Sequence, residues 1–212
     1  MSVDIKRPVF LSGENPGMTL YEPDTDRPIA ILSYWHVTDS PYGTGNALVL
    51  WLEKAIVSGS LRFSGGIFSD RLSLARTLTE TLTQYFPEFS DVPVASLPYH
   101  EAHCEHTYKD GKRYVVTCVS GKNKIVVEWI DPLDRRAISI PDFPIGEQCF
   151  ELRNVVCPCG AGILKINDKI VPGKIQTGVR IDGSPSSTAF LAFAESWVGP
   201  MNPHSNLTGE LP

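Results

Sequence analysis

The sequence predicts a mainly β protein: an antiparallel β-barrel or sandwich with one packed amphipathic helix near residues 70–86. Short runs rich in β-branched and aromatic residues follow one another along the chain, separated by turn-forming residues. One stretch repeats its apolar residues at helical spacing. Because closure or sheet-on-sheet packing protects the edges of an antiparallel sheet, we expect a barrel or sandwich. An α+β fold with few helices is the related alternative.

The chain has 212 residues, a length that suits one domain with a core of its own. We therefore predict a single domain over 1–212. The segments 1–28 and 200–212 are rich in Pro, Gly, Asn and Asp and show little apolar periodicity. This composition predicts irregular arms at both ends.

The first half of the chain contains the clearest strand pair. The runs 29–37 and 46–53 flank a Ser-Pro-Tyr-Gly turn at 40–43, which predicts antiparallel neighbours. A third strand-like run covers 55–68. The predicted helix follows, with Ser69 or Asp70 as its cap. Its apolar residues recur until Pro87, so one stripe of the helix should pack on a sheet.

The second half predicts more strands joined by tight turns. The segment 92–98 is expected to be extended, and Asp110-Gly111 is the strongest hairpin signal of the chain. A second turn at 121–124 leads into a strand over 125–130. Further strands are predicted over 150–156, 162–166, 169–171, 175–181 and 189–198.

Composition and charge narrow the classes of binding partner that we expect. The net charge is -5, and the chain has no run rich in Lys or Arg, which argues against nucleic acid and anionic membranes. The N-terminus lacks the apolar segment of a signal peptide, and no stretch is apolar for the length of a membrane span. We therefore expect a cytoplasmic protein that binds a small molecule and requires no cofactor, with homo-oligomerisation left open.

Five cysteines and five histidines carry most of the candidate chemistry. In a long chain without secretory signals, an odd number of cysteines predicts reduced thiols. The pair in Cys157-Pro158-Cys159 does not have the C-x-x-C spacing of redox motifs, so ordinary thiols are expected there. His36 fits a packed barrel residue as well as a ligand contact.

The segment 100–106 holds three of the histidines together with Glu101, Cys104 and Glu105. A two-residue turn at Asp110-Gly111 would place Lys109 opposite Lys112. Side chains alternate along strands, so one face would then carry a set of ionisable and polar residues: Tyr99, Glu101, His103, Cys118, Ser120 and Lys122. Strand geometry separates the outer two histidines, His100 and His106, by roughly 20 Å. The alternative metal site is therefore limited to Cys104 and His106, with other ligands from elsewhere.

The order of these elements resembles the acetoacetate decarboxylase-like family over roughly residues 29–130. The resemblance rests on a strand, the turn at 40–43, a second strand, and Ile67-Phe68-Ser69 leading into a helix that carries Ala75-Arg76. The hairpin adds Gly111, Arg113 and Lys122 at the spacing of the family's strand that leads to its Schiff-base lysine. The resemblance implies a barrel in which Lys122 forms an imine with a carbonyl substrate.

These observations give three functional expectations. The first is a lyase-like enzyme that acts on a carbonyl or keto acid through Lys122, with His103 and Glu101 moving protons and Tyr99, Cys118, Ser120 and Arg76 contacting the substrate. The second is a metal-dependent enzyme that uses the His100–His106 segment. The third is a ligand-binding barrel without catalysis. Lys122 also fits a solvated turn lysine, because it lies in Gly-Lys-Asn-Lys at 121–124.

Overall fold

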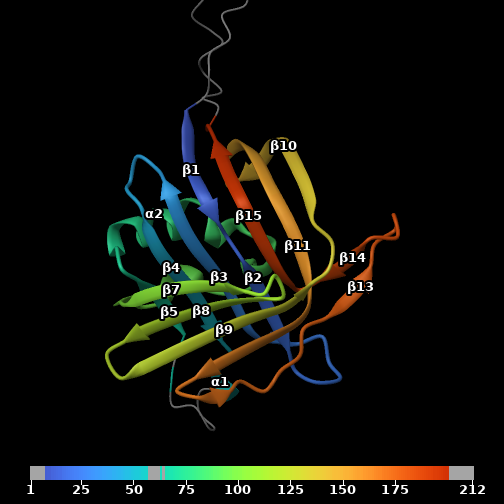
Figure 1. The fold of residues 1–212 in the computed structure, drawn as a ribbon. Helices are drawn as coiled ribbons and strands as arrows, with labels where there is room; N and C mark the ends of the chain where they lie inside the picture. Colours follow the sequence, from blue (N-terminus) through green and yellow to red (C-terminus); the bar gives the residue numbers. More distant parts are fainter. Residues whose placement is uncertain (1–7, 57–62, 64, 201–212) are drawn as a thin grey trace, which may run out of the picture.

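The computed structural model describes residues 8–56, 63 and 65–200. One large sheet dominates it (Figure 1). Its central part runs in the spatial order β5 (Gly66–Ser69), β4 (Gly45–Leu52), β3 (Pro28–Asp39), β1 (Val9–Glu14), β15 (Ala189–Val198), β11 (Gln148–Ile166) and β10 (Arg136–Ile145). The short strand β2 (Gly17–Tyr21) pairs with both β3 and β15. The predicted mainly β fold is confirmed.

The long strand β11 forms the corner of the fold. Its first part, up to Pro158, pairs with β10 and β15, and its second part, from Cys159, pairs with β9 (Asn123–Pro132). Strands β8 (Arg113–Ser120) and β7 (His103–Lys109) continue from β9 and cross in front of the central sheet (Figure 1). The remaining pairings are β6 (Tyr99–Glu101) parallel to β5, β12 (Lys169–Ile170) on β11, and β13 (Thr177–Val179) with β14 (Pro185–Ser187).

Two hydrophobic cores lie on opposite faces of the central sheet. The inner core fills the space between that sheet and β7–β9, and it includes Leu32, Leu48 and Trp129. The outer core lies under helix α2 (Leu72–Thr81) and the 3₁₀ turns Thr83–Tyr85, Pro87–Phe89 and Val94–Ser96. Alternation along β3 divides its side chains between the two, so Trp35 packs outward and Tyr34 inward. A further short helix, α1, spans Lys54–Ile56.

The predicted elements at 29–37 and 46–53 correspond to β3 and β4, and they pair as expected. The predicted N-terminal arm is wrong where the structure describes it, because β1 and β2 lie inside the sheet. Both strands are short and contain Gly or polar residues, so their pairing depends on neighbours distant in sequence. Residues 1–7 and 201–212 of the predicted arms lie outside the described residues.

Several other predicted boundaries differ from those in the structure. The helix ends at Thr81 rather than near residue 86, and a 3₁₀ turn continues it. Its N-cap is Arg71 without a side-chain cap, because Asp70 accepts hydrogen bonds from Asn46 instead. The predicted strand at 55–68 is reduced to β5, with 57–62 and 64 outside the described residues, and 92–98 contains a 3₁₀ turn. The predicted strands at 150–156 and 162–166 are one continuous strand, β11.

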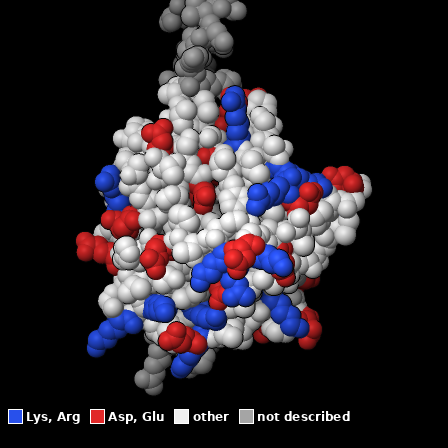
Figure 2. All heavy atoms as spheres, viewed as in Figure 1, with Lys and Arg blue, Asp and Glu red and all other residues white. Residues whose placement is uncertain are grey.

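Charged side chains are mixed in sign on the face that carries β7–β9. Figure 2 shows lysine, arginine and acidic residues interspersed there, whereas the part over β1 and β15 carries few charges. Ion pairs account for part of this mixing, since Glu128 accepts from both Arg113 and Lys165. Among the described helices, none is both long enough and apolar enough to cross a membrane.

Candidate functional site

The β7–β8 hairpin has a different register from the predicted one. Lys109 pairs with Arg113, and the Lys112 amide closes the turn by donating to the Lys109 carbonyl at 3.0 Å. Asp110 and Gly111 both adopt positive φ angles, 52° and 65°. The turn therefore contains one residue more than expected, and this shift places the even-numbered residues of β8 on the same face as the even-numbered residues of β7. Cys104, His106, Tyr114 and Cys118 accordingly point toward the inner core.

The predicted catalytic residues lie on the outer face of this hairpin. Glu101 and His103 are exposed, and both line a shallow hollow of about 610 Å³ together with Asp70 and Val119. Lys122 is exposed in the β8–β9 turn and does not line that hollow. The structure brings two of the three predicted residues together and separates the lysine from them.

The predicted substrate-binding residues divide into three places. The Ser120 hydroxyl donates to the Glu101 carbonyl at 2.6 Å, beside the hollow. The Arg76 guanidinium lies 4.6 Å from the centre of the Tyr99 ring, a cation–π contact between α2 and β6. Cys118 is buried in the inner core. These residues do not form one site with Lys122.

Cys104 and Cys118 face each other across β7 and β8 and form a disulfide. The expectation of reduced thiols is therefore wrong for this pair, as is the alternative in which the Cys104 thiolate binds a metal. Sequence spacing gave no signal, because the bond depends on the hairpin register. Cys149, Cys157 and Cys159 are free. Burial raises the pKa of Cys159 to about 12, so its thiol stays protonated.

The structure instead assembles polar side chains around Asn46, at the seam where β7 meets β4. We call this the Asn46 cluster: Tyr34, His36, Asn46, Asp70 and His106. Asn46 lies opposite His36 in the β3–β4 pairing. Its amide nitrogen donates to Asp70 Oδ2 at 2.8 Å and to the Cys104 carbonyl at 3.1 Å, so it connects β4 to β7. The rings of His36 and His106, both half-buried, lie 4.4 Å apart between centroids.

The hydrogen bonds of Asn46 determine which nitrogen of each imidazole carries the proton. Both partners of Asn46 Nδ2 are acceptors, so Oδ1 must be the atom that faces His36 Nδ1 and the Tyr34 hydroxyl, each at 2.8 Å. His36 therefore donates from Nδ1. Tyr34 uses its proton for Asn46, so its oxygen accepts from His106 Nδ1 at 3.4 Å. In the neutral form of each ring the lone pair then lies on Nε2, and no described side chain is hydrogen-bonded to either Nε2.

The surroundings of His106 keep it neutral. Burial and the neighbouring His36 lower the pKa of His106, while the Glu14 carboxylate acts in the opposite direction. Glu14 is fixed by the Tyr114 hydroxyl, which donates to Oε2 at 2.5 Å, and the Tyr114 ring stacks on His106. Burial and Glu14 raise the pKa of Tyr114, so this hydroxyl remains a donor. A neutral base thus lies beside a carboxylate that would stabilise its protonated form.

A second ionisable group lies on the other face of the sheet. Glu195 is only 3% exposed, and a β-bulge at Ala194, with φ of 51°, directs it into the outer core. Trp197 Nε1 donates to one carboxyl oxygen at 2.5 Å, and Asn154 Nδ2 donates to the other at 2.6 Å. Burial raises the pKa of Glu195 to about 7.

Sequence reasoning singled out His36 and His106 but assigned neither to this cluster. Tyr34, Asn46, Asp70, Glu14 and Tyr114 were missed, since they come from β1, β3, β4, β8 and the β5–α2 connection. The alternation of Tyr34 with His36 on β3 was the available signal, because it placed two polar aromatic residues on one face. Nothing local indicated that β7 would meet β4.

Over the described ranges 8–56, 63 and 65–200, no group of three or more His, Cys, Asp and Glu side chains is arranged to hold a metal ion. The chain matches no family model, no curated protein and no solved structure. The Asn46 cluster is therefore the candidate site.

Proposed function

We propose that the protein binds a small organic molecule at the Asn46 cluster and uses His106, assisted by His36, as a general base. The substrate class that fits is a carbonyl compound with an acidic C–H bond next to the carbonyl. His106 Nε2 takes the proton, the electron pair of the C–H bond forms the enolate, and the imidazolium returns the proton to the product. The observation that carries the proposal is the pair of half-buried imidazoles whose Nδ1 atoms are both engaged inward.

Three features support a base at this position. Burial and His36 lower the pKa of His106, so the ring is unprotonated near neutral pH. Glu14 lies close enough to favour the charged ring after proton transfer. Asn46 and Tyr34 fix the ring tautomers before any ligand arrives, which reduces the reorganisation that the reaction requires.

The imine route expected from the sequence has less support. A lysine nucleophile needs desolvation or a neighbouring cation to lose its proton near neutral pH, and Lys122 is exposed in a turn. The lining of the hollow at Glu101 and His103 also includes Asp70 and contains no lysine or arginine. Two carboxylates there disfavour the carboxylate of a keto acid.

The proposal is tested with 5-nitrobenzisoxazole, an uncharged aromatic probe that ring-opens to a yellow nitrophenolate when a base removes its C–H proton. We expect the wild-type protein to accelerate this reaction, with a rate that rises with pH as one imidazole deprotonates. His106→Ala should lower the rate about a hundredfold, a typical effect of removing a general base.

His103→Ala is the matched control, because His103 lies on the same strand but on its outer, exposed face. This variant should keep the wild-type rate. Equal losses in the two variants, or a wild-type rate no higher than that of His106→Ala, would contradict the assignment. Imidazole ¹⁵N spectra provide the structural check, since the neutral rings of His36 and His106 should both carry their single N–H proton on Nδ1.

A further inference from the structure

A groove on the outer surface is lined by exposed aromatic residues and shares no lining residue with the Asn46 cluster. It consists of two adjoining hollows, of about 580 and 380 Å³, which share Thr81 and Gln148 as lining residues. We call it the Tyr42–Tyr85 groove. It follows the junction between the end of α2, the β10–β11 turn, the β3–β4 turn and the start of β1.

Three large apolar side chains are left exposed along this groove. Val9 is 44% exposed, Tyr42 is 47% exposed and Tyr85 is 49% exposed. Large side chains that are exposed together, rather than singly, are typical of a binding surface. Each tyrosine combines a flat apolar ring with a hydroxyl, a combination that is enriched at interaction sites.

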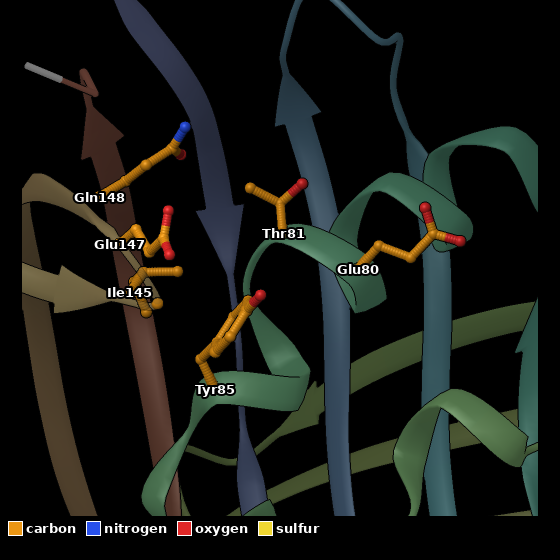
Figure 3. Close-up of a pocket in the computed structure, with 7 residues that line it drawn as sticks. Glu80, Thr81, Tyr85, Ile145, Glu147 and Gln148 are labelled. Atoms are coloured by element: carbon orange, nitrogen blue, oxygen red, sulfur yellow. The ribbon is translucent and has the colours of Figure 1, made fainter. Parts of the chain in front are cut away.

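Both tyrosines are held by the fold rather than by a partner. Tyr42 packs on Phe10, with ring centroids 5.3 Å apart. Tyr85 lies against Gly146, where a side chain would meet the ring at 3.0 Å and where φ is positive at 58°. Figure 3 shows Tyr85 rising from the 3₁₀ turn toward Thr81, with Glu147 and Gln148 of the β10–β11 hairpin across from it. The rings are therefore in place before a partner binds.

One end of the groove is acidic. Glu147 lines it from the β10–β11 turn and forms no ion pair with the residues that the structure describes. Glu80 lines the same hollow from α2, where Arg76 lies 3.5 Å away. The lining includes no lysine or arginine. An occupant with a positive charge at this end would complement it.

We propose that the Tyr42–Tyr85 groove docks an extended, proline-containing segment of another protein, with a lysine or arginine placed beside Glu147. A polyproline II segment loses little conformational entropy on binding, and its rings pack on exposed aromatic faces. Gln148 and Thr81, between the two tyrosines, supply hydrogen-bonding groups for the carbonyls of such a segment. Because the basic residue lies beside Glu147 at one end of the groove, it determines in which of the two chain directions the segment binds.

The test uses a fluorescein-labelled peptide with two arginines followed by three Pro-Leu repeats, and follows its anisotropy as the full-length protein is added. Tyr42→Ala and Tyr85→Ala should each weaken binding about tenfold, as expected for aromatic anchors. Glu147→Lys should weaken it at low salt and have less effect at high salt. Tyr108→Ala is the matched control, because Tyr108 is a similarly exposed tyrosine, 40%, outside the groove.

A second peptide with glutamates in place of the arginines should bind more weakly than the first. The proposal is overturned if the arginine peptide does not bind, if the tyrosine variants bind it like the wild type, or if the glutamate peptide binds equally well. It is also overturned if Tyr42→Ala and Tyr85→Ala convert a dimer to a monomer, because the occupant would then be a second copy of the chain. Light scattering measures the molar mass in solution and so distinguishes the dimer from the monomer.

Discussion

Both faces of the central sheet hold ionisable side chains, but these side chains differ in how deeply they are buried and in how many of their polar atoms are hydrogen-bonded within the protein. In the outer core, Glu195 is fully enclosed, and each of its carboxyl oxygens has a donor. At the rim of the inner core, His36 and His106 are half-buried and use only Nδ1 within the protein. A saturated, enclosed group stabilises a structure, whereas a partly open group with a free lone pair is available to a ligand.

Removing the carboxyl groups on the two faces should have unequal effects. Glu195→Ala leaves the Trp197 and Asn154 donors without acceptors and creates a cavity, so the free energy of unfolding should fall by about 3 to 5 kcal/mol. Glu14→Ala on the inner side should cost about 1 kcal/mol, because Glu14 is half-buried and water can reach the position it leaves. Urea unfolding measures both, and equal losses would contradict the comparison.

The disulfide provides a test of the inner face alone. Cys104 and Cys118 are separated by 14 residues, a loop for which the chain-entropy model gives about 3 kcal/mol of stability. Replacing both with alanine, or adding reductant to the wild type, should lower the free energy of unfolding by a comparable amount. Reductant should have no further effect on the double variant. A wild-type protein that is insensitive to reductant would argue against the bond.

The outer face should control how stability depends on pH. The pKa of Glu195 is raised from 4.5 to about 7 in the folded protein, so the folded state holds a proton that the unfolded state releases. The stabilising contribution of this group is full below about pH 4.5 and is lost as pH rises toward 7, a total of about 3 kcal/mol. Glu195→Gln should remove this fall. Its amide can donate to Asn154 Oδ1, a buried atom without a hydrogen-bond partner, once the Asn154 amide turns over.

His106 on the inner face should contribute a pH dependence of stability with the opposite sign. Because the pKa of His106 is lowered on folding, its stabilising contribution is present above the unfolded pKa of about 6.5 and is lost as pH falls through the folded value. In NMR titrations, Glu14→Gln should lower the pKa of His106 further, and His36→Ala should raise it. Shifts in the reverse directions would mean that the charges acting on His106 are not those of these two neighbours.

The smallest effect is expected at Lys122. Lys122→Ala should change stability by less than about 0.5 kcal/mol, as for other exposed positions. It should also leave the rate with 5-nitrobenzisoxazole unchanged, since Lys122 is not in the Asn46 cluster. If borohydride trapping with a keto acid gives a covalent adduct that this variant lacks, the imine route is favoured over the imidazole base.

The sequence alone determined the strand-rich character, the β3–β4 pair, the single amphipathic helix and the position of the Asp110-Gly111 turn. These features are local, because alternation, helical spacing and turn chemistry act over a few residues. It did not determine the register of the hairpin, since a turn of two or three residues fits the same motif. That one-residue difference placed Cys118 and Tyr114 on the face of Cys104 and His106 instead of the face of His103 and Glu101.

Only the tertiary structure decided which ionisable groups meet. The Asn46 cluster joins β3, β4, β7 and the β5–α2 connection, and Glu195 reaches its donors through a bulge in β15. Pairings of this kind depend on the packing of segments that lie far apart in the chain, where no short-range pattern acts. The sequence thus supplied the imidazoles and carboxylates, and the folded sheet determined which are enclosed and which remain partly exposed.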